Sequence, residues 1–247
     1  MDLGLRNKVA IVTGGADGIG GAIAVALAAE GCDVAIVDRS ADAGCTLQAV
    51  AAHGRRGRAI QADVRDAAAA AAIVADVARE FGRLDIVVCN AGITADATLA
   101  RMTEAQWDDV IDVNLKGCFN YMHAAARHFM ERKGGRIVNI ASINGLRGKF
   151  GQANYAASKG GMIAMSKTAA RELGRYNVTV NVVAPGMVMT PMARRLPADV
   201  IERAVDETVL GRLVTPEDCA NAVVFLCSEG ARHITGEVIQ VDGGQYL

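Results

Sequence analysis

Three polar side chains in the middle of the chain could together move a proton to or from an oxygen atom. Tyr155 and Lys159 are four residues apart in a stretch that predicts a helix, so their side chains share one face. A neighbouring ammonium favours the phenolate, so we expect it to lower the pKa of Tyr155 from about 10. Ser142 follows a predicted strand and could hydrogen-bond the same oxygen. The set predicts general acid–base chemistry at an alcohol or carbonyl, although an exposed tyrosine beside a solvated lysine gives the same spacing.

A glycine-rich segment near the N-terminus could bind a pyrophosphate. It reads Thr-Gly-Gly-Ala-Asp-Gly-Ile-Gly over residues 13–20, and its spaced glycines are Gly14, Gly18 and Gly20. Glycine permits a tight turn and a close approach of the backbone to phosphate oxygens, and a helix that begins there presents free N–H groups. A strand is predicted before this segment and a helix after it. That context favours phosphate binding over an ordinary strand–helix turn.

An acidic residue ends the next predicted strand. Asp38 lies eighteen residues after Gly20, where a carboxylate can accept hydrogen bonds from the two hydroxyls of a ribose. The same charge repels a 2′-phosphate, so Asp38 favours NAD over NADP, and Asp17 in the glycine turn acts in the same direction. Arg39 beside Asp38 could offset part of this preference. A solvated aspartate at the end of a strand is the alternative interpretation.

A regular alternation of strands and helices has to position these residues. Short apolar runs rich in β-branched residues predict buried strands, and the segments between them predict helices. The predicted strands are residues 9–13, 34–37, 59–62, 84–89, 136–141, 178–183 and 238–241. The predicted helices are residues 19–30, 43–53, 67–81 after Asp66 as N-cap, 103–131, 154–173 and 216–228. This pattern predicts an α/β fold: a single domain over residues 1–247 with a Rossmann-type, doubly wound, parallel, seven-stranded sheet and helices on both faces.

The composition limits the classes of partner. The chain has 247 residues, 51% of them hydrophobic, and a formal net charge of -1, whereas nucleic-acid and anionic-membrane binders carry a basic excess. No segment predicts a membrane span or a secretory signal. The six cysteines include no Cys-x-x-Cys pair and no zinc-binding spacing. We therefore expect a cytoplasmic protein with free thiols and no metal, nucleic-acid or membrane partner.

Taken together and in order, these segments resemble the short-chain dehydrogenase/reductase family over essentially the whole chain. The matching segments are the glycine turn, Asp63-Val64, Cys-Asn-Ala-Gly at 89–92, Val113-Asn114, Ser142, Tyr-Ala-Ala-Ser-Lys at 155–159, Pro185-Gly186 with Thr190, and Val-Asp-Gly-Gly at 241–244. Two positions depart from the family pattern. Cys89 stands where Asn is usual, which puts the local rigidity in doubt, and Asp17 stands where Ser or Arg is common.

The resemblance implies a role for many residues. It adds Asn114 to the catalytic set of Ser142, Tyr155 and Lys159, as the holder of a water that links Lys159 to solvent; taken alone, Asn114 also fits a kink in a helix. Asp63 would accept a hydrogen bond from the adenine amino group, and Asn90 would stabilise the central strands. The implied cofactor-binding residues are Gly14, Asp17, Gly18, Ile19, Gly20, Asp38, Arg39, Asp63, Val64, Asn90, Gly92, Tyr155, Lys159, Pro185, Val188 and Thr190.

The substrate is less sharply indicated. We expect an NAD-dependent enzyme for a mainly apolar secondary alcohol or ketone, cyclic and aromatic ones included, because the methionine-rich segment 187–212 would cover the site as a lid. The expected substrate contacts are Ser142, Ile143, Gln152, Tyr155, Met187 and Met192. The alternative is a 3-oxoacyl thioester, because residues 151–155 and 90–94 resemble that branch of the family. A basic set could then bind an acidic carrier or a coenzyme A phosphate: Arg132, Lys133, Arg175, Arg194 and Arg195. A nucleotide-binding sensor without turnover is a third hypothesis.

The resemblance also implies a homotetramer, because relatives pair their long fourth and fifth helices. The helix after Tyr155 carries small residues on which a partner could approach closely: Ala156, Ala157, Gly160, Gly161 and Ala164. The alternative is that these small residues only seat the helix against its own sheet.

Overall fold

One all-parallel sheet forms the centre of the molecule. The structure is a computed structural model, and it describes residues 2–190, 193 and 197–247. In this part of the chain seven strands follow the order β3-β2-β1-β4-β5-β6-β7. Their bounds are β1 (Val9–Thr13), β2 (Asp33–Asp38), β3 (Gly57–Gln61), β4 (Ile86–Cys89), β5 (Gly135–Ile140), β6 (Val178–Pro185) and β7 (Val238–Val241). The predicted Rossmann-type fold is confirmed.

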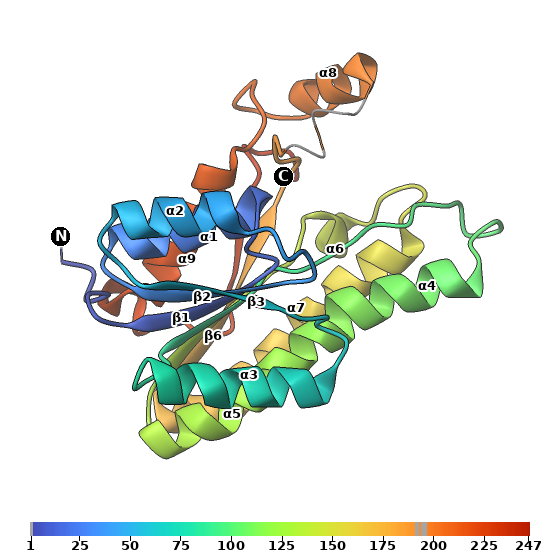
Figure 1. The fold of residues 1–247 in the computed structure, drawn as a ribbon. Coiled ribbons are helices and arrows are strands. Elements are labelled where there is room, and N and C mark those ends of the chain that lie inside the picture. The colour runs from blue at the N-terminus through green and yellow to red at the C-terminus, as the bar shows by residue number, and fades with distance from the viewer. Residues whose placement is uncertain (1, 191–192, 194–196) are drawn as a thin grey trace.

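Helices cover both faces of this sheet (Figure 1). One layer consists of α1 (Gly18–Ala29), α2 (Gly44–Ala52) and α9 (Pro216–Cys227), and the other of α3 (Ala67–Glu80), α5 (Gly117–Arg132) and α7 (Ala153–Leu173). Each layer encloses its own apolar core. Ile23 and Leu27 are fully buried in the first core, and Tyr121 and Phe129 are fully buried in the second. Because both faces are covered, the central strands β1 and β4 are buried along their whole length, whereas the edge strand β3 alternates exposed and half-buried residues.

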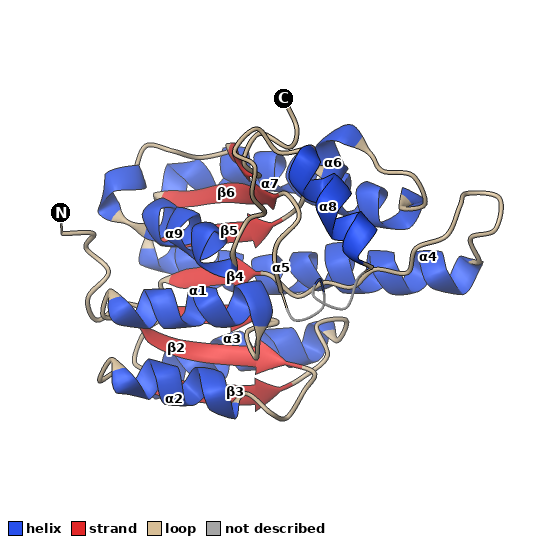
Figure 2. Cartoon of the chain, turned by 90° about the horizontal axis from the view of Figure 1, so that it is seen from above, coloured by secondary structure: helices blue, strands red, loops and turns tan. Residues whose placement is uncertain are grey.

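The register brings the carboxyl ends of the strands to one edge. Thr13 at the end of β1 pairs with Val37 of β2 and with Cys89 of β4, and Cys89 pairs with Asn139 of β5. The chain order reverses at β1, which lies between β2 and β4. Ligands of doubly wound sheets bind beyond the carboxyl ends of the strands at such a reversal. Figure 2 shows the strand arrows pointing toward the side on which two short helices lie, α6 (Asn144–Arg147) and α8 (Ala198–Asp206).

The helix predicted over residues 103–131 is divided by a wider turn. α4 (Glu104–Val110) begins at a capping box formed by Thr103 and Gln106. A π-helical turn, η1 (Ile111–Lys116), follows it and leads into α5. A π turn interrupts the α-helical repeat and frequently lies at a functional site. This one contains Asn114, so the backbone is irregular at this residue, whereas a kink there stays a prediction.

The remaining helices are short, and periodicity did not predict them. α6 (Asn144–Arg147) comes directly after Ser142 and Ile143, and α8 (Ala198–Asp206) lies within the predicted lid segment. Two 3-10 turns, η2 (Gly174–Tyr176) and η4 (Glu229–Ala231), follow α7 and α9. An ion pair of 3.1 Å between Arg147 and Glu207 connects α6 to the end of α8. The two short helices therefore meet on the substrate side of the sheet edge.

Some properties of the described residues bear on partners. None of their helices has both the length and the apolar character needed to cross a membrane. No group of three His, Cys, Asp or Glu residues in this part of the chain is arranged to hold a metal ion. All six cysteines are free; Cys45 is exposed, and the other five are buried. The Cys89 thiol donates to the carbonyl oxygen of Cys118 at 3.7 Å, so the residue that departs from the family pattern still bonds to α5.

Candidate active site

The glycine turn forms one end of the site. Gly14 and Gly18 have φ angles of +62° and +55°, the left-handed region that favours glycine. A Cβ atom on Gly20 would lie 2.0 Å from the carbonyl oxygen of Gly14, so only glycine lets α1 start this close to β1. The side chain of Asp17, the N-cap residue, does not cap α1. The first N–H groups of the helix therefore remain available for a phosphate.

Asn90 holds the glycine turn against the neighbouring strand end. Its Nδ2 donates to the carbonyl oxygens of Thr13 at 3.1 Å and of Gly14 at 2.9 Å. In return, Oγ1 of Thr13 accepts from the N–H groups of Asn90 and Ala91. These bonds join the ends of β1 and β4, as the family resemblance implied for Asn90.

Two acidic residues lie where the adenosine half of a dinucleotide would bind. Oδ2 of Asp38 accepts from the N–H of Ala16 at 3.2 Å, and Oδ1 accepts from the N–H of Ser40 at 2.9 Å. These bonds orient the carboxylate at the end of β2. Asp63 is paired with Arg65 at 2.7 Å, and hydrogen bonds from Arg65 hold the pKa of Asp63 below its usual value. Asp63 is thus a charged acceptor at neutral pH.

Lys159 is anchored to the end of β5. Its Nζ donates to the carbonyl oxygen of Ile140 at 2.7 Å, and the residue is only 3% exposed. Nζ also lies 5.6 Å from the centre of the Tyr155 ring. Burial lowers the pKa of Lys159 to about 8, because a buried ammonium loses its hydration. Lys159 and Tyr155 therefore share one face of α7, as predicted.

The pKa of Tyr155 departs from the sequence prediction. Burial raises it above 10, a hydrogen bond from Ser142 lowers it in part, and the charge of Asp96 raises it further. The lowering that we predicted from Lys159 is therefore wrong for the chain by itself, because burial disfavours the charged phenolate and Lys159 is not among the groups that shift this pKa. In this state Tyr155 is a proton donor rather than a phenolate.

Asn114 connects the π turn to the loop after β4. Its Oδ1 accepts from the N–H of Ile93 at 2.8 Å, and its Nδ2 donates to the carbonyl oxygen of Ile93 at 3.0 Å and to Ser158 at 3.1 Å. A Cβ atom on Gly92 would lie 3.3 Å from Oδ1 of Asn114 and 3.4 Å from Nζ of Lys159. The fully buried Asn114 thus fixes the loop that lies beside Lys159. Its role in holding a water remains a prediction.

These groups line one cavity of about 570 Å³. It contains all the predicted cofactor-binding residues except Gly20, which acts instead through its close packing on Gly14. It also contains residues that we did not predict, most of them next to a quoted motif: Val37, Ala62, Ala91, Ile93, Thr94, Val113, Ile140, Ala141 and Gly186. Free helix N–H groups lie at one end and Ser142, Tyr155 and Lys159 at the other. This donor set fits a nicotinamide dinucleotide.

Comparison with known proteins agrees with this geometry. A short-chain alcohol dehydrogenase family model, described as "Enoyl-(Acyl carrier protein) reductase", matches residues 14–245. The chain belongs to the short-chain dehydrogenase/reductase family. It is 43% identical over 241 residues to a 3-oxoacyl-[acyl-carrier-protein] reductase of Thermotoga maritima, covering 97% of this chain and 98% of that protein. A protein of the same name from Staphylococcus epidermidis is 42% identical over 243 residues, 98% of this chain and 100% of that protein. Acetoacetyl-CoA reductase of Acinetobacter sp. is 48% identical over 166 residues, 67% of each chain.

Membership of the short-chain dehydrogenase/reductase family makes this chain an oxidoreductase of the ketoreductase type that uses a nicotinamide cofactor. Of the substrate contacts that we expected, Ser142 and Tyr155 line the cavity. Ile143 is only 2% exposed and lies in the protein interior. Met192 lies outside the described residues.

Two other expected substrate contacts have their polar groups already bonded. Gln152 is 8% exposed, and its amide donates to Asp96 at 2.9 Å and accepts from Asn144 at 3.0 Å. The backbone N–H of Met187 donates to the side chain of Gln245 at 2.9 Å. Neither residue lines the cavity, so their contact with a substrate stays a prediction.

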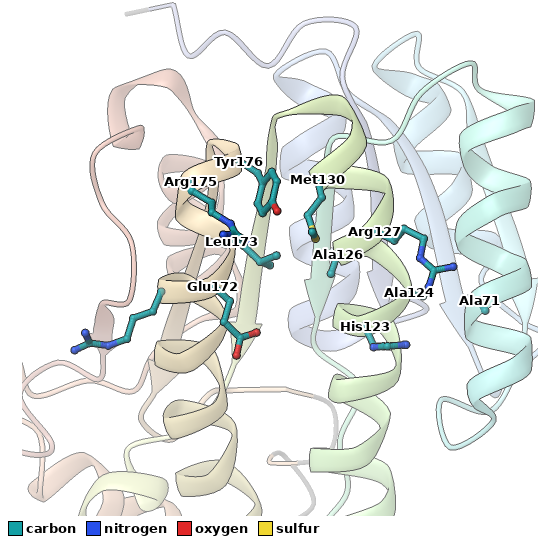
Figure 3. A pocket seen from close by; sticks show the side chains of 11 residues that line it. Ala71, His123, Ala124, Ala126, Arg127, Met130, Glu172, Leu173, Arg175 and Tyr176 are labelled. Carbon is teal, nitrogen blue, oxygen red and sulfur yellow. The ribbon is translucent and has the colours of Figure 1, made fainter.

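A larger hollow of about 820 Å³ lies far from the reacting groups. Figure 3 shows that it opens between α5, which contributes His123 and Met130, and the C-terminal end of α7 with Tyr176 beyond it. Tyr155 lies near the other end of α7, whose 21 residues span about 30 Å. This hollow therefore cannot share the chemistry of the site described above.

Proposed function

We propose that this enzyme reduces the ketone of a 3-oxoacyl thioester with NADH, and that it catalyses the reverse oxidation when product and NAD accumulate. The observation that carries the proposal is one cavity in which the glycine turn and Asp38 lie at one end and Ser142, Tyr155 and Lys159 at the other. A cofactor and a carbonyl group could bind there end to end. Catalysis, rather than nucleotide sensing alone, is favoured because the three reacting groups are together.

The side chains divide the chemistry between them. When bound, the nicotinamide supplies the hydride that adds to the carbonyl carbon. The hydroxyl of Tyr155 gives its proton to the carbonyl oxygen, so the ketone becomes a secondary alcohol and the tyrosine becomes a phenolate. The O–H of Ser142 donates a hydrogen bond to the same oxygen while negative charge develops there. Lys159, held on Ile140, stabilises the phenolate until a proton returns from solvent.

The relatives move the proposed substrate away from our sequence-based preference. We expected a free, apolar secondary alcohol or ketone, but none of these three relatives is named for such a substrate. Two full-length relatives at 42–43% identity are named as reductases of 3-oxoacyl groups on a carrier protein, and a third is named as a reductase of acetoacetyl-CoA. The thioester alternative, which rested on residues 90–94 and 151–155, is therefore the better-supported substrate class.

The proposed preference for NADH rests on Asp38. Its carboxylate lines the cavity and is oriented by the N–H groups of Ala16 and Ser40. A ribose diol could donate two hydrogen bonds to it, whereas a 2′-phosphate would meet like charge. Arg39 lines the same cavity and supplies the opposing influence.

Initial rates on a matched substrate panel test the proposal. Acetoacetyl-CoA is the thioester probe, a set of cyclic and aromatic ketones represents the free substrates, and crotonyl-CoA tests the enoyl reduction in the family description. Each is measured with NADH and with NADPH. We expect the highest kcat/KM with acetoacetyl-CoA and NADH. A higher kcat/KM on any free ketone or on crotonyl-CoA would contradict the substrate class.

We also propose that the enzyme is a homotetramer that uses the outer surface of α7. Ala157 and Ala164 are exposed and seven residues apart, so they lie on one face of the helix. Gly161 and Gly160 instead pack within the chain, because a Cβ atom on them would lie 3.0 Å from Leu115 and 3.1 Å from Gly145. The two alanines are therefore available to a partner, whereas the two glycines seat the helix within its own chain. Sedimentation velocity tests the assembly, and a stable monomer at micromolar concentration would contradict it.

A further inference from the structure

A chain of side-chain hydrogen bonds borders the substrate side of the site, outside the residues that line the cofactor cavity. It begins in the loop after β4, where Oδ2 of Asp96 accepts from Nε2 of Gln152 at 2.9 Å. Oε1 of Gln152 accepts from Nδ2 of Asn144 at 3.0 Å. Oδ1 of Asn144 accepts from Nε of Arg147 at 3.2 Å. This first half joins the loop after β4 to the start of α7 and to α6.

The second half continues from Arg147 to the C-terminal tail. Nη2 of Arg147 donates to Oε2 of Glu207 at 3.1 Å, and Nη1 donates to the backbone carbonyl oxygen of Gln245 at 3.2 Å. Nε2 of Gln245 donates to Oε2 of Glu207 at 3.0 Å, and its Oε1 accepts from the N–H of Met187 at 2.9 Å. The tail is therefore tied to both α6 and the segment after β6.

Arg147 is the centre of this chain. All three of its guanidinium nitrogens donate, each to a different residue, although its side chain is only 22% exposed. Hydrogen bonds from Gln245 and from Arg147 keep the pKa of Glu207 below its usual value, so this carboxylate is charged at neutral pH. Charge-assisted bonds of this kind are about twice as strong as neutral ones. Loss of Arg147 would leave three acceptors without this donor.

The chain touches the reacting groups at two points. The N–H of Asn144 donates to Oγ of Ser142 at 3.1 Å, so the hydroxyl hydrogen of Ser142 is left for Tyr155 or, once a substrate binds, for its carbonyl oxygen. At the other end, the Gln245 side chain is so close to the backbone after β6 that a Cβ atom on Gly186 would lie 2.6 Å from its Oε1. Val188, which lines the cavity, comes two residues later. Displacement of the chain would therefore move both walls around the carbonyl.

We infer that Arg147, acting through Glu207 and Gln245, is a positioning residue for the carbonyl substrate. It sets the distance between the Ser142 wall and the segment that follows β6. The cofactor end of the cavity, formed by the glycine turn and Asp38, has no bond to this chain. The inference rests on the proposed carbonyl reduction, because it assigns Arg147 a larger role toward that substrate than toward NADH, whose expected contacts in the glycine turn and at Asp38 have no bond to this chain.

A double-mutant cycle tests this inference with Arg147→Gln, Glu207→Gln and the double variant. We expect Arg147→Gln to lower kcat/KM for the carbonyl substrate about tenfold or more, because small displacements of positioning groups are costly, while the Kd of NADH changes less than about twofold. Glu207→Gln keeps an oxygen that can accept from Gln245 and should have a smaller effect. The double variant should be no worse than Arg147→Gln, because the two residues act through one contact. Arg147→Lys should recover part of the loss.

Arg79→Gln is the matched control. Arg79 lies on α3 and pairs with Asp76 at 2.6 Å, the two side chains are 76% and 42% exposed, and neither bonds to this chain of hydrogen bonds. We expect its kcat/KM to equal that of the wild type. Thermal unfolding of each variant separates local positioning from general loss of stability, and Glu207→Gln and Arg147→Lys carry the test if Arg147→Gln does not fold.

Three outcomes would overturn the inference. The first is an unchanged kcat/KM in Arg147→Gln, and the second is an equal loss of NADH affinity. The third is an effect seen with acetoacetyl-CoA but absent with the N-acetylcysteamine thioester, which lacks phosphates; Arg147 would then bind coenzyme A directly. If acetoacetyl-CoA is no substrate, the proposed function fails, and the same cycle is measured on whichever ketone the wild type reduces fastest.

Discussion

The ammonium of Lys159 donates to the carbonyl oxygen of Ile140 across 2.7 Å and so connects α7 to the carboxyl end of β5. One bond to a backbone oxygen compensates only part of the hydration that this nearly buried cation has lost. Burial therefore lowers the pKa of Lys159 to about 8. The contact places a titrating group at the site. The energetic cost of burying its charge should be measurable in the free energy of unfolding.

Lys159→Met should change how stability depends on pH. The pKa of Lys159 is about 8 in the folded protein and 10.5 in the unfolded chain, so between these pH values the unfolded chain holds more protons and the folded state gains stability as the pH rises. The variant lacks this gain. We expect the free energy of unfolding of the wild type to rise by about 2 kcal/mol relative to the variant from pH 8 to pH 10. Urea denaturation at several pH values measures it, and parallel curves would contradict the burial cost.

Tyr155→Phe should remove the proton donor and leave the ring in place. We expect kcat to fall by at least about a hundredfold, the usual value of general acid catalysis, with little change in the Kd of NADH. Steady-state rates and fluorescence titration measure the two quantities. Tyr176→Phe, on η2 at the far end of α7, is the control and should keep wild-type turnover. Near-normal turnover of Tyr155→Phe would exclude the proposed acid.

Asp38→Ala should narrow the preference between the two cofactors. For the wild type we expect kcat/KM with NADH to exceed that with NADPH at least about tenfold, or about 1.4 kcal/mol. Loss of the carboxylate removes the diol acceptor and the repulsion of a 2′-phosphate together. Asp42→Ala is the control, because Asp42 is exposed and does not line the cavity. A wild-type enzyme with equal efficiency for both cofactors would show that Asp38 does not select.

Gly20→Ala should disturb the phosphate end of the cavity. The added methyl would lie 2.0 Å from the carbonyl oxygen of Gly14 and 2.5 Å from Nδ2 of Asn90, so α1 or β1 must shift. We expect a loss of about 1–3 kcal/mol in the free energy of unfolding, together with weaker NADH binding. Gly174→Ala, where no atom lies within 4 Å of the new methyl, should do neither. Equal behaviour of the two variants would mean that the turn tolerates a side chain.

Ala164→Arg should weaken the proposed tetramer without harming the fold. Ala164 is exposed on the outer face of α7, so an arginine there can be solvated in a monomer but not in a close helix pair. We expect a smaller sedimentation coefficient and unchanged circular dichroism. Gln48→Arg adds the same charge to an exposed position of α2 and should leave the assembly intact. An unchanged tetramer in Ala164→Arg would place the interface elsewhere.

The fold was predictable because its signals are local. The β-branched runs at residues 9–13 and 238–241 predicted β1 and β7 at their observed bounds, and Asp66 caps α3 through the N–H of Ala69, as expected. The glycine turn was recognisable because backbone geometry restricts it to glycine. Short helices such as α6, with four residues, are too brief to show a period.

The substrate side was less predictable because distant residues decide it. Gln152 looked available for a substrate, yet its amide is bonded to Asp96 and Asn144. Gln245, next to the family's Val-Asp-Gly-Gly segment, carried no signal of its own and completes a contact with Met187 at 58 residues' separation. The pKa of Tyr155 likewise depends on how deeply the folded chain buries it.

The π turn lies between two helices, α4 and α5, whose orientations depend on different neighbours. The carbonyl oxygen of Gln106 in α4 accepts from Asn154 of α7 at 2.9 Å, whereas α5 is oriented by the sheet beneath Phe129. Each residue of an α-helix advances the direction of the side chains by about 100°. A π turn uses one more residue than an α turn, so it takes up that residue without turning α4 relative to α5. Deletion of one residue within Ile111–Lys116 would restore a regular helix with α4 and α5 in about the same orientation, but it would change the direction of the side chains inside the segment. The bonds of Asn114 to Ile93 would then be lost while the bond of α4 to Asn154 remains, so the length of this segment is a constraint independent of its composition.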